Sequence, residues 1–242
     1  MMEILHPEDW QTKQKVLVIL AHPDDPEFFC GATLTRWIDA GHEVSYLLLT
    51  KGEKGSEDPA MTPEILTAVR MKEQRAAGEV IGVKEITFMD CPDGYLIPDL
   101  SLRKEVVRHI RQVRPDVIVT SDPQNYYIRG RHINHPDHRA AGLVTIEAVF
   151  PAAGNRFYYP ELLKEGLEPH TPQEVWVSLP VDPTIVVDVT TQWSNKLKAL
   201  LEHKSQIGDP EKFLRNMTER RTPDSSVDHP RYEESFRRLY RR

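Results

Sequence analysis

The sequence predicts an α/β fold with a doubly wound, mostly parallel sheet and helices on both of its faces. Four apolar segments, residues 15–20, 43–49, 85–89 and 116–120, have the length and continuous hydrophobicity of buried parallel strands. Segments with helical periodicity separate these strands, which is the pattern of βαβ units. With 242 residues, of which 39% are hydrophobic, the chain can build one domain with a substantial core. We therefore expect a single domain over residues 1–242.

The helices between the strands are predicted over residues 31–40, 62–81 and 102–113. Thr62 and Pro63 form a typical helix start, since a hydroxyl caps the first turn and proline suits the first helical position. After the fourth strand we expect, in order, a long polar loop over residues 122–134, a helix over 139–149, irregular surface over 151–172, short β-segments over 174–178 and 184–188, and a helix over 192–203. From about residue 208 we expect a charged, helical C-terminal tail, with Arg237-Arg238 and Arg241-Arg242 at a solvated helix end.

Composition excludes several classes of partner. The 31 basic and 37 acidic residues give a net charge of −6, which argues against a nucleic-acid surface. No segment approaches the roughly 20 apolar residues of a transmembrane helix, and the N-terminal residues lack the pattern of a signal peptide. The two cysteines, Cys30 and Cys91, provide no disulfide framework. We therefore expect a cytoplasmic protein with no nucleic-acid partner and no membrane span, and we expect Cys30 to be a small buried apolar residue.

Two clusters of histidine and aspartate carry the chemical signal. Ala21-His-Pro-Asp-Asp25 directly follows the first strand, and His135-Pro-Asp-His138 follows the loop after the fourth. In such a sheet the carboxyl ends of neighbouring parallel strands meet at one edge, where ligands bind. One histidine and one aspartate from the first cluster and one histidine from the second would give three ligands and an open position, as in catalytic zinc sites. The same ligand types suit Zn²⁺, Fe²⁺ and Mn²⁺.

The remaining side chains of the two clusters suit hydrolysis. A bound metal lowers the pKa of water to about 7, and a carboxylate outside the coordination sphere can take the proton of that water. A free imidazole can stabilise an oxyanion or protonate a leaving group, and Asp137 can orient an imidazole. Either cluster alone is as typical of a structural turn or helix N-cap as it is of a metal site. Their occurrence at neighbouring strand ends favours a metal-assisted hydrolase of an amide or ester.

The paired motifs resemble the PIG-L/LmbE-like family of metal-dependent N-deacetylases, and the resemblance extends from residue 15 to about residue 206. It implies a Rossmann-like fold and a zinc ion bound by His22, Asp25 and His138. It also implies removal of an N-acetyl group from an N-acetylglucosamine-type substrate, a small-molecule amino-sugar conjugate. Members of this family often assemble as oligomers, so the resemblance is compatible with a homo-oligomer.

The resemblance also implies roles for the other motif residues. Asp24 is the general base, His135 is the second catalytic histidine, and Asp137 supports His135. The sequence departs from the family after the aspartate pair, where Pro26 replaces the usual acidic residue and Glu27 follows one position later. We therefore assign Glu27 only an indirect contact with the site.

Substrate contacts are harder to assign. The resemblance places Arg70 and Glu73 near the sugar, whereas their spacing alone predicts a solvated ion pair of small energetic value. Asn134 precedes the second motif and is a candidate to bind an acyl or hydroxyl group. Ile133 stands where members acting in thiol biosynthesis carry tyrosine, which disfavours mycothiol chemistry.

Two alternatives to N-deacetylation stay open at this point. One is a metal-dependent amidase that acts on another conjugate, and the other is a catalytically inactive sugar-binding module. The complete set of motif residues disfavours the second, because a binding module need not keep a general base. Enzymes that use nucleotide cofactors are poor candidates, since neither a glycine-rich dinucleotide fingerprint nor a P-loop is present.

Overall fold

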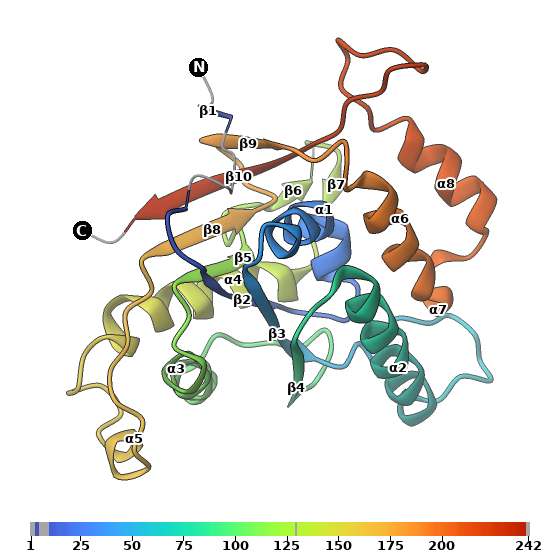
Figure 1. Cartoon of the computed structure of the whole chain (residues 1–242). Helices are drawn as coiled ribbons and strands as arrows, with labels where there is room; N and C mark the ends of the chain where they lie inside the picture. Colours follow the sequence, from blue (N-terminus) through green and yellow to red (C-terminus); the bar gives the residue numbers. More distant parts are fainter. Residues whose placement is uncertain (1–2, 5–9, 129, 241–242) are drawn as a thin grey trace.

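The computed structural model describes residues 3–4, 10–128 and 130–240, and it shows a mostly parallel sheet between two layers of helices (Figure 1). The strands of this sheet are β1 (Glu3–Ile4), β2 (Lys15–Leu20), β3 (Glu43–Thr50), β4 (Glu85–Cys91), β5 (Val117–Ser121), β8 (Glu174–Ser178), β9 (Ile185–Asp188) and β10 (Glu233–Tyr240). Their order is β1-β9-β10-β8-β5-β2-β3-β4. The run from β8 to β4 is parallel throughout. The predicted fold class is therefore confirmed.

The helices cover both faces of the sheet. They are α1 (Asp25–Asp39), α2 (Pro63–Ile81), α3 (Leu100–Val113), α4 (Pro136–Glu147), an irregular helical stretch η2 (Ala148–Ala153), α5 (Glu161–Lys164), α6 (Trp193–Glu202), α7 (Lys204–Ile207) and α8 (Pro210–Thr218). On one face the core contains side chains of α1, α2, α6 and α8. On the other it contains side chains of α3, α4, η2 and α5.

Strand β2 shows why its sequence is apolar throughout. Val16 and Val18 pack on the face of α1, whereas Leu17 and Ile19 pack on the face of α3 and α4, and all four are buried. A strand at the centre of a doubly wound sheet has no solvated face, so alternation of polar and apolar residues is lost. This burial fixes the position of the polar residues that follow the strand.

The boundaries of α2 match the sequence signals, and those of α1 do not. Thr62 caps α2 by accepting a hydrogen bond from the backbone N–H of Ile65, at 3.3 Å. Helix α1 begins at Asp25, six residues before the predicted start at residue 31. Pro26 is tolerated in the first turn, where its missing N–H would have no helical partner. The second half of the first motif therefore lies at the positive end of the α1 helix dipole, which stabilises the negative charge of carboxylates there.

The predicted helical tail from residue 208 is wrong beyond α8. Residues 233–240 form β10, which pairs antiparallel with both β8 and β9. Arg238 was expected at a helix end, but its guanidinium instead pairs with Glu174 of β8, at 2.6 Å, and lies over the ring of Trp176. Arg237 also lies in this strand and pairs with Asp182. The pair Arg241-Arg242 lies outside the described residues.

The expected loop over residues 122–134 contains a small antiparallel hairpin, β6 (Tyr127–Ile128) with β7 (His132–Ile133).

Within residues 3–4, 10–128 and 130–240, no helix combines the length and the hydrophobicity that a membrane span requires.

Candidate metal centre

The two sequence clusters meet at the carboxyl edge of the neighbouring strands β2 and β5. His22 lies just after β2, and the second cluster forms the start of α4, with His135 at its N-cap. Ser121, the last residue of β5, donates a hydrogen bond from its hydroxyl to the carbonyl of His138, at 2.5 Å. Gly142 permits this close packing, since a Cβ there would lie 2.1 Å from the carbonyl oxygen of Ser121. The expected proximity of the clusters is confirmed.

Hydrogen bonds define which nitrogen of His138 faces the first cluster. Asn134 donates its amide N–H to the carbonyl of Asn125, at 2.7 Å, so its amide oxygen must face His138. That oxygen lies 2.9 Å from His138 Nδ1, which therefore carries a proton and donates. Because neutral imidazole has one proton, His138 Nε2 is left with a lone pair. This atom lies 3.0 Å from Oδ1 of Asp25.

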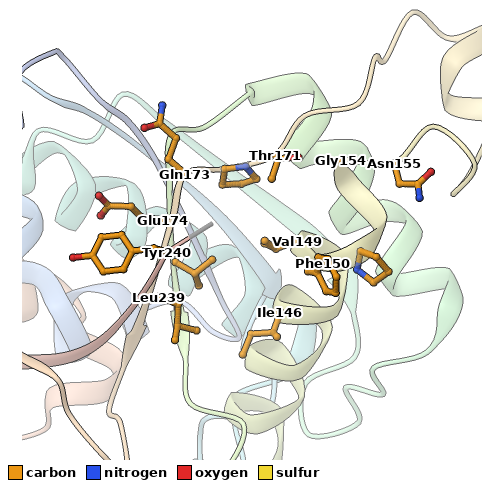
Figure 2. Close-up of a pocket in the computed structure, with 13 residues that line it drawn as sticks. Ile146, Val149, Phe150, Gly154, Asn155, Thr171, Gln173, Glu174, Leu239 and Tyr240 are labelled. Carbon is orange, nitrogen blue, oxygen red and sulfur yellow. The ribbon is translucent and has the colours of Figure 1, made fainter. Parts of the chain in front are cut away.

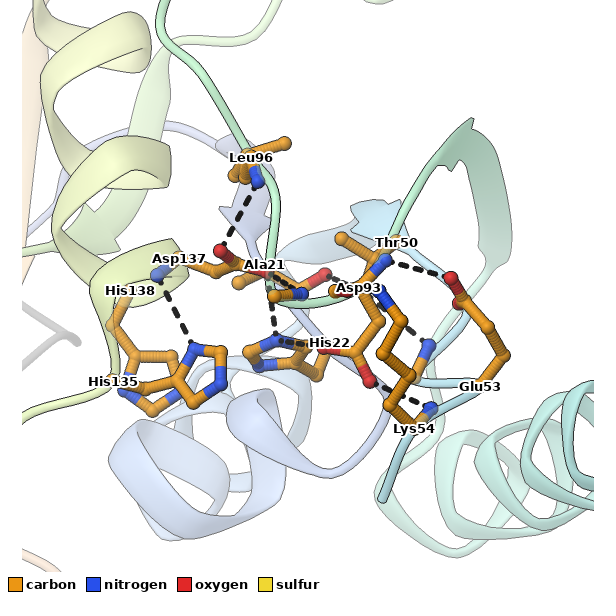
Figure 3. A network of polar contacts seen from close by, with 12 residues as sticks. Ala21, His22, Thr50, Glu53, Lys54, Asp93, Leu96, His135, Asp137 and His138 are labelled. Atoms are coloured by element: carbon orange, nitrogen blue, oxygen red, sulfur yellow. Dashed lines mark hydrogen bonds and ion pairs between the residues drawn. The ribbon is translucent and has the colours of Figure 1, made fainter. Parts of the chain in front are cut away.

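The same reasoning applies to His22. Its Nε2 lies 3.1 Å from a carboxylate oxygen of Asp93 and 3.3 Å from one of Asp137 (Figure 3). Both partners are acceptors when ionised, so Nε2 carries the proton. The lone pair of His22 Nδ1 then faces Oδ2 of Asp25, at 3.4 Å. Asp137 is itself held by the backbone N–H groups of Gly94, at 2.7 Å, and Leu96, at 3.2 Å.

Three groups with lone pairs thus lie around the same space: His22 Nδ1, the Asp25 carboxylate and His138 Nε2. A proton or a metal ion can bridge such acceptors, and Asp25 Oδ2 also accepts from the backbone N–H of His22, at 2.9 Å. Asp25 contacts the two histidines through different oxygens, Oδ1 at 3.0 Å from His138 Nε2 and Oδ2 at 3.4 Å from His22 Nδ1. Among the described residues, donor atoms within 4.8 Å of one another form two groups of three, His22 with His135 and His138, and His22 with Asp93 and Asp137, and Asp25 is in neither group. Histidine and carboxylate donors gathered in this way suit a divalent metal. Hydrogen bonds to the far nitrogens of both imidazoles are also typical of metal-ligating histidines.

The charges around Asp25 agree with a cation site. Burial raises the pKa of Asp25, but His138 and His22 outweigh it and hold that pKa well below its usual range. Burial lowers the pKa of His22, and the Asp25, Asp137 and Asp93 carboxylates outweigh it and raise that pKa. The site therefore has a strong demand for positive charge, which protons or a metal can meet.

Asp24 lies beside this space and is not one of the three groups with lone pairs. Its carboxylate lies 3.2 Å from the guanidinium of the buried Arg70. Arg70 also donates to the carbonyls of Pro23, at 2.5 Å, and Gly52, at 2.9 Å. Gly52 is required there, because a Cβ would lie 2.1 Å from the guanidinium. Burial raises the pKa of Asp24 to about 6, although Arg70 opposes this rise.

His135 lies beside His22, with 4.6 Å between the ring centroids. Its Nδ1 accepts a hydrogen bond from the backbone N–H of Asp137, at 3.2 Å, so a neutral His135 carries its proton on Nε2. Partial burial lowers the pKa of His135, and the nearby His22 and His138 lower it further. The expectation that Asp137 supports His135 needs correction: the Asp137 carboxylate contacts the imidazole of His22, and only its backbone contacts His135.

A cavity of about 480 Å³ opens over these residues. Its lining includes the motif side chains together with Phe28, Phe29, Lys54 and Arg70. A larger hollow of about 710 Å³ lies elsewhere, between η2 and the ends of β8 and β10 (Figure 2). That hollow is lined mainly by apolar side chains such as Ile146, Val149 and Phe150, so it lacks the hydrolytic chemistry of the first cavity.

Two residues predicted to bind substrate have other partners. Glu73 accepts hydrogen bonds from the backbone N–H and the hydroxyl of Ser205, at 2.9 and 2.7 Å, and is not among the residues that line the 480 Å³ cavity. Asn134 is buried and uses both ends of its amide within the protein, so it orients His138. Arg70 does line the cavity, although its charge faces Asp24.

Sequence reasoning missed Asp93 and Gln74. Asp93 follows β4, at the same sheet edge as the two motifs, and a carboxylate just after a strand was a usable signal. Gln74 lies in the middle of α2 and accepts a hydrogen bond from the backbone N–H of Asp24, at 2.8 Å. No local pattern marks a glutamine within a helix as part of a distant site.

Comparison with known proteins agrees with this geometry. The sequence profile of the PIG-L family, described as GlcNAc-PI de-N-acetylase, matches residues 17–149. A diacetylchitobiose deacetylase from Thermococcus kodakarensis is 37% identical over 200 residues, which cover 83% of this chain and 73% of the relative. A mycothiol S-conjugate amidase from Streptomyces coelicolor is 32% identical over 168 residues, or 61% of this chain and 55% of the relative.

A solved structure extends the match to nearly the whole chain. The N,N'-diacetylchitobiose deacetylase from Pyrococcus horikoshii, in complex with an inhibitor, superposes with a TM-score of 0.87 and 29% identity. The superposition covers 98% of this chain and 87% of that one. The profile match covers more than half of the chain and includes both motifs together with strands β3, β4 and β5. The chain belongs to the PIG-L family.

Proposed function

We propose that this protein is a metal-dependent N-deacetylase, which hydrolyses the acetamide of an N-acetylglucosamine-type sugar and releases acetate and a free amine. The observation that carries the proposal is the arrangement of His22 Nδ1, the Asp25 carboxylate and His138 Nε2 around one space beside the separate carboxylate of Asp24. The relatives named above are a deacetylase of diacetylchitobiose and an amidase of mycothiol S-conjugates, and both names describe hydrolysis of an acyl bond.

We assign His22, Asp25 and His138 as the metal ligands and zinc as the metal. Three protein ligands leave a position open, which distinguishes a catalytic zinc site from a structural one. When bound, the metal supplies Lewis acidity, which lowers the pKa of water and polarises the substrate carbonyl. Fe²⁺ and Mn²⁺ also suit these ligand types, so the choice of zinc needs direct measurement.

Asp24 is assigned as the general base. Its carboxylate takes a proton from the attacking water and then returns it to the nitrogen of the leaving amine. A pKa of about 6 suits both steps at neutral pH, since the carboxylate is ionised and its conjugate acid is still a useful proton donor. Arg70 keeps the carboxylate oriented by its contact at 3.2 Å.

His135 is assigned as the donor to the oxyanion. Burial lowers the pKa of His135 and so favours its neutral imidazole, and the proton of that imidazole is on Nε2 because Nδ1 accepts from the backbone of Asp137. A fixed neutral donor suits stabilisation of the negative charge that develops on the carbonyl oxygen. Asp137 acts on His22 and so belongs to the support of the metal ligands.

The cavity suits a small amino-sugar conjugate. Phe28 and Phe29 offer apolar surface to a sugar ring, while Lys54 and Arg70 offer hydrogen-bond donors. Both cysteines are free in the structure, and Cys30 is buried, which suits the reducing cytoplasm in which we place the protein.

The test joins metal analysis with an assay for free amine. The purified protein is analysed for bound metal and then assayed with fluorescamine against N-acetylglucosamine, diacetylchitobiose and N-acetylglucosaminyl conjugates, with acetate measured in parallel. We expect one equivalent of metal and equal amounts of amine and acetate. Amine release without acetate would identify an amidase of another conjugate. A protein with no bound metal and no turnover of any substrate would refute the proposal.

A further inference from the structure

Three buried side chains form a network behind Asp24, on the side away from the cavity. Glu27 of α1, Gln74 of α2 and His203, which lies between α6 and α7, each have 0% exposed surface. Gln74 donates its side-chain N–H₂ to both carboxylate oxygens of Glu27, at 3.0 and 3.1 Å. His203 Nε2 lies 3.2 Å from the same carboxylate. The network therefore joins segments that are 47 and 176 residues apart.

The backbone N–H of Asp24 fixes the direction of the hydrogen bonds that Gln74 makes. A backbone N–H can only donate, so Gln74 presents its N–H₂ group to Glu27 and its carbonyl oxygen to Asp24. That oxygen accepts from the backbone N–H of Asp24, at 2.8 Å. Since His203 Nδ1 is buried without a partner among the described residues, the imidazole proton belongs on Nε2, where it is donated to Glu27.

The bond to Asp24 holds a strained backbone. Asp24 has φ 92° and ψ −29°, in the left-handed region that a residue with a Cβ rarely adopts. Such conformations persist only where the surroundings over-determine them, and they concentrate at active sites. This conformation places the Asp24 carboxylate toward Arg70 and the cavity, while Asp25 points to the histidines.

We propose that Glu27, Gln74 and His203 are positioning residues that hold Asp24 in its strained conformation. The two carboxylate oxygens of Glu27 accept from the Gln74 amide and so hold its direction, and that amide fixes the backbone of the base. This inference rests on the proposed function in that it treats Asp24 as the general base. Its structural part, the restraint of the Asp24 backbone, is independent of any activity.

The test uses Glu27→Gln, which keeps size but removes the acceptor-only group. The new amide places a donor against Gln74 or His203. If the new donor faces Gln74, the Gln74 amide must turn, and its N–H₂ group then faces the N–H of Asp24. If the new donor faces His203, the imidazole proton must move to Nδ1, which has no partner among the described residues. We expect kcat to fall about 10- to 100-fold, with KM and metal content unchanged. Hydrogen exchange at the Asp24 amide, followed by NMR, should accelerate by a similar factor.

A second variant restores a consistent pairing of donors and acceptors in the network. In Glu27→Gln/Gln74→Glu, the carboxylate introduced at position 74 accepts from the Asp24 N–H and from the amide introduced at position 27. The carbonyl oxygen of that amide accepts from His203. We expect recovery of most of the lost kcat and of slow exchange at Asp24. The matched control is Thr35→Val, which removes a buried hydrogen bond within α1, from the Thr35 hydroxyl to the Gly31 carbonyl at 2.9 Å. It should lower Tm and leave kcat and Asp24 exchange unchanged.

The outcomes separate this inference from the proposed function. Wild-type kcat and wild-type exchange in Glu27→Gln, or no recovery in the double variant, would overturn the positioning role. A loss of kcat that is matched by Thr35→Val at equal loss of Tm would also overturn it, because stability alone would then explain the effect. If the wild-type protein deacetylates nothing but exchange at Asp24 still depends on Glu27, the proposed function fails and the structural restraint stands.

Discussion

Replacing Asn134 by alanine tests whether this residue orients His138 or contacts the substrate. The sequence suggested a substrate contact, whereas the structure shows its amide oxygen 2.9 Å from His138 Nδ1. In Asn134→Ala, the proton on Nδ1 loses its partner and the ring loses its orientation. Removal of such a partner from a metal-ligating histidine weakens metal binding about 10- to 100-fold, which is about 1.4–2.7 kcal/mol.

The assay is a titration of the metal-free protein with zinc against a competing chelator. We expect the zinc Kd of Asn134→Ala to rise by that factor, while KM measured at saturating zinc stays within twofold of wild type. Asn125→Ala is the matched control: it removes another buried asparagine, whose amide donates to the Leu179 carbonyl at 2.7 Å and does not contact His138. An unchanged zinc Kd together with a raised KM would refute our reasoning and restore the substrate role.

Three further predictions concern the base and the metal. Asp24→Asn should lower kcat about 10²- to 10⁴-fold with metal retained, and loss of metal in that variant would show that Asp24 is a ligand. Because only ionised Asp24 can accept a proton, kcat/KM should fall as the pH drops through about 6, or through a lower pH once a cation is bound. Arg70→Met removes the positive charge that lowers the pKa of Asp24, so it should move this acid limb of the pH profile to higher pH. The measured pH profiles of both proteins test this. Chelation should abolish activity and lower Tm, and zinc should restore both, whereas full activity after complete metal removal would exclude a metal role.

The sequence predicted the parallel half of the sheet because strands buried on both faces are apolar throughout. Strand β10 was not predicted, because its burial depends on partners that are distant in the chain. Glu234 is buried in β10 because Lys196 of α6, at 2.5 Å, and the backbone N–H groups of Ala32 and Thr33 of α1 bind its carboxylate. Arg238 likewise needs Glu174 of β8. A strand with so many charges has no local pattern that separates it from a solvated helix.

In the candidate site, too, local patterns predicted some residues, whereas others depend on contacts between distant segments. One histidine and one aspartate of the first motif and one histidine of the second could be proposed as ligands, because each motif follows a strand that ends at the same sheet edge. The family resemblance then implied the particular set His22, Asp25 and His138. The groups that orient these ligands could not be proposed in this way. Asp93 contacts His22 through the packing of β4 beside β3, and Asn134 contacts His138 through a turn within the second loop. Hydrogen-bond direction at these contacts is a tertiary property, and it decides which nitrogen of each histidine is available to a metal.

The Pro26–Glu27 departure from the family pattern has a physical consequence in this fold. Successive residues of a helix point about 100° apart, so an acidic residue at position 26 would face a different direction from one at position 27. Pro26 here occupies the first turn of α1, where proline costs no hydrogen bond. Glu27 faces Gln74 and His203 on the side of α2 and α6, away from the three groups with lone pairs. The displaced acid therefore contacts Gln74, which in turn accepts from the backbone N–H of Asp24.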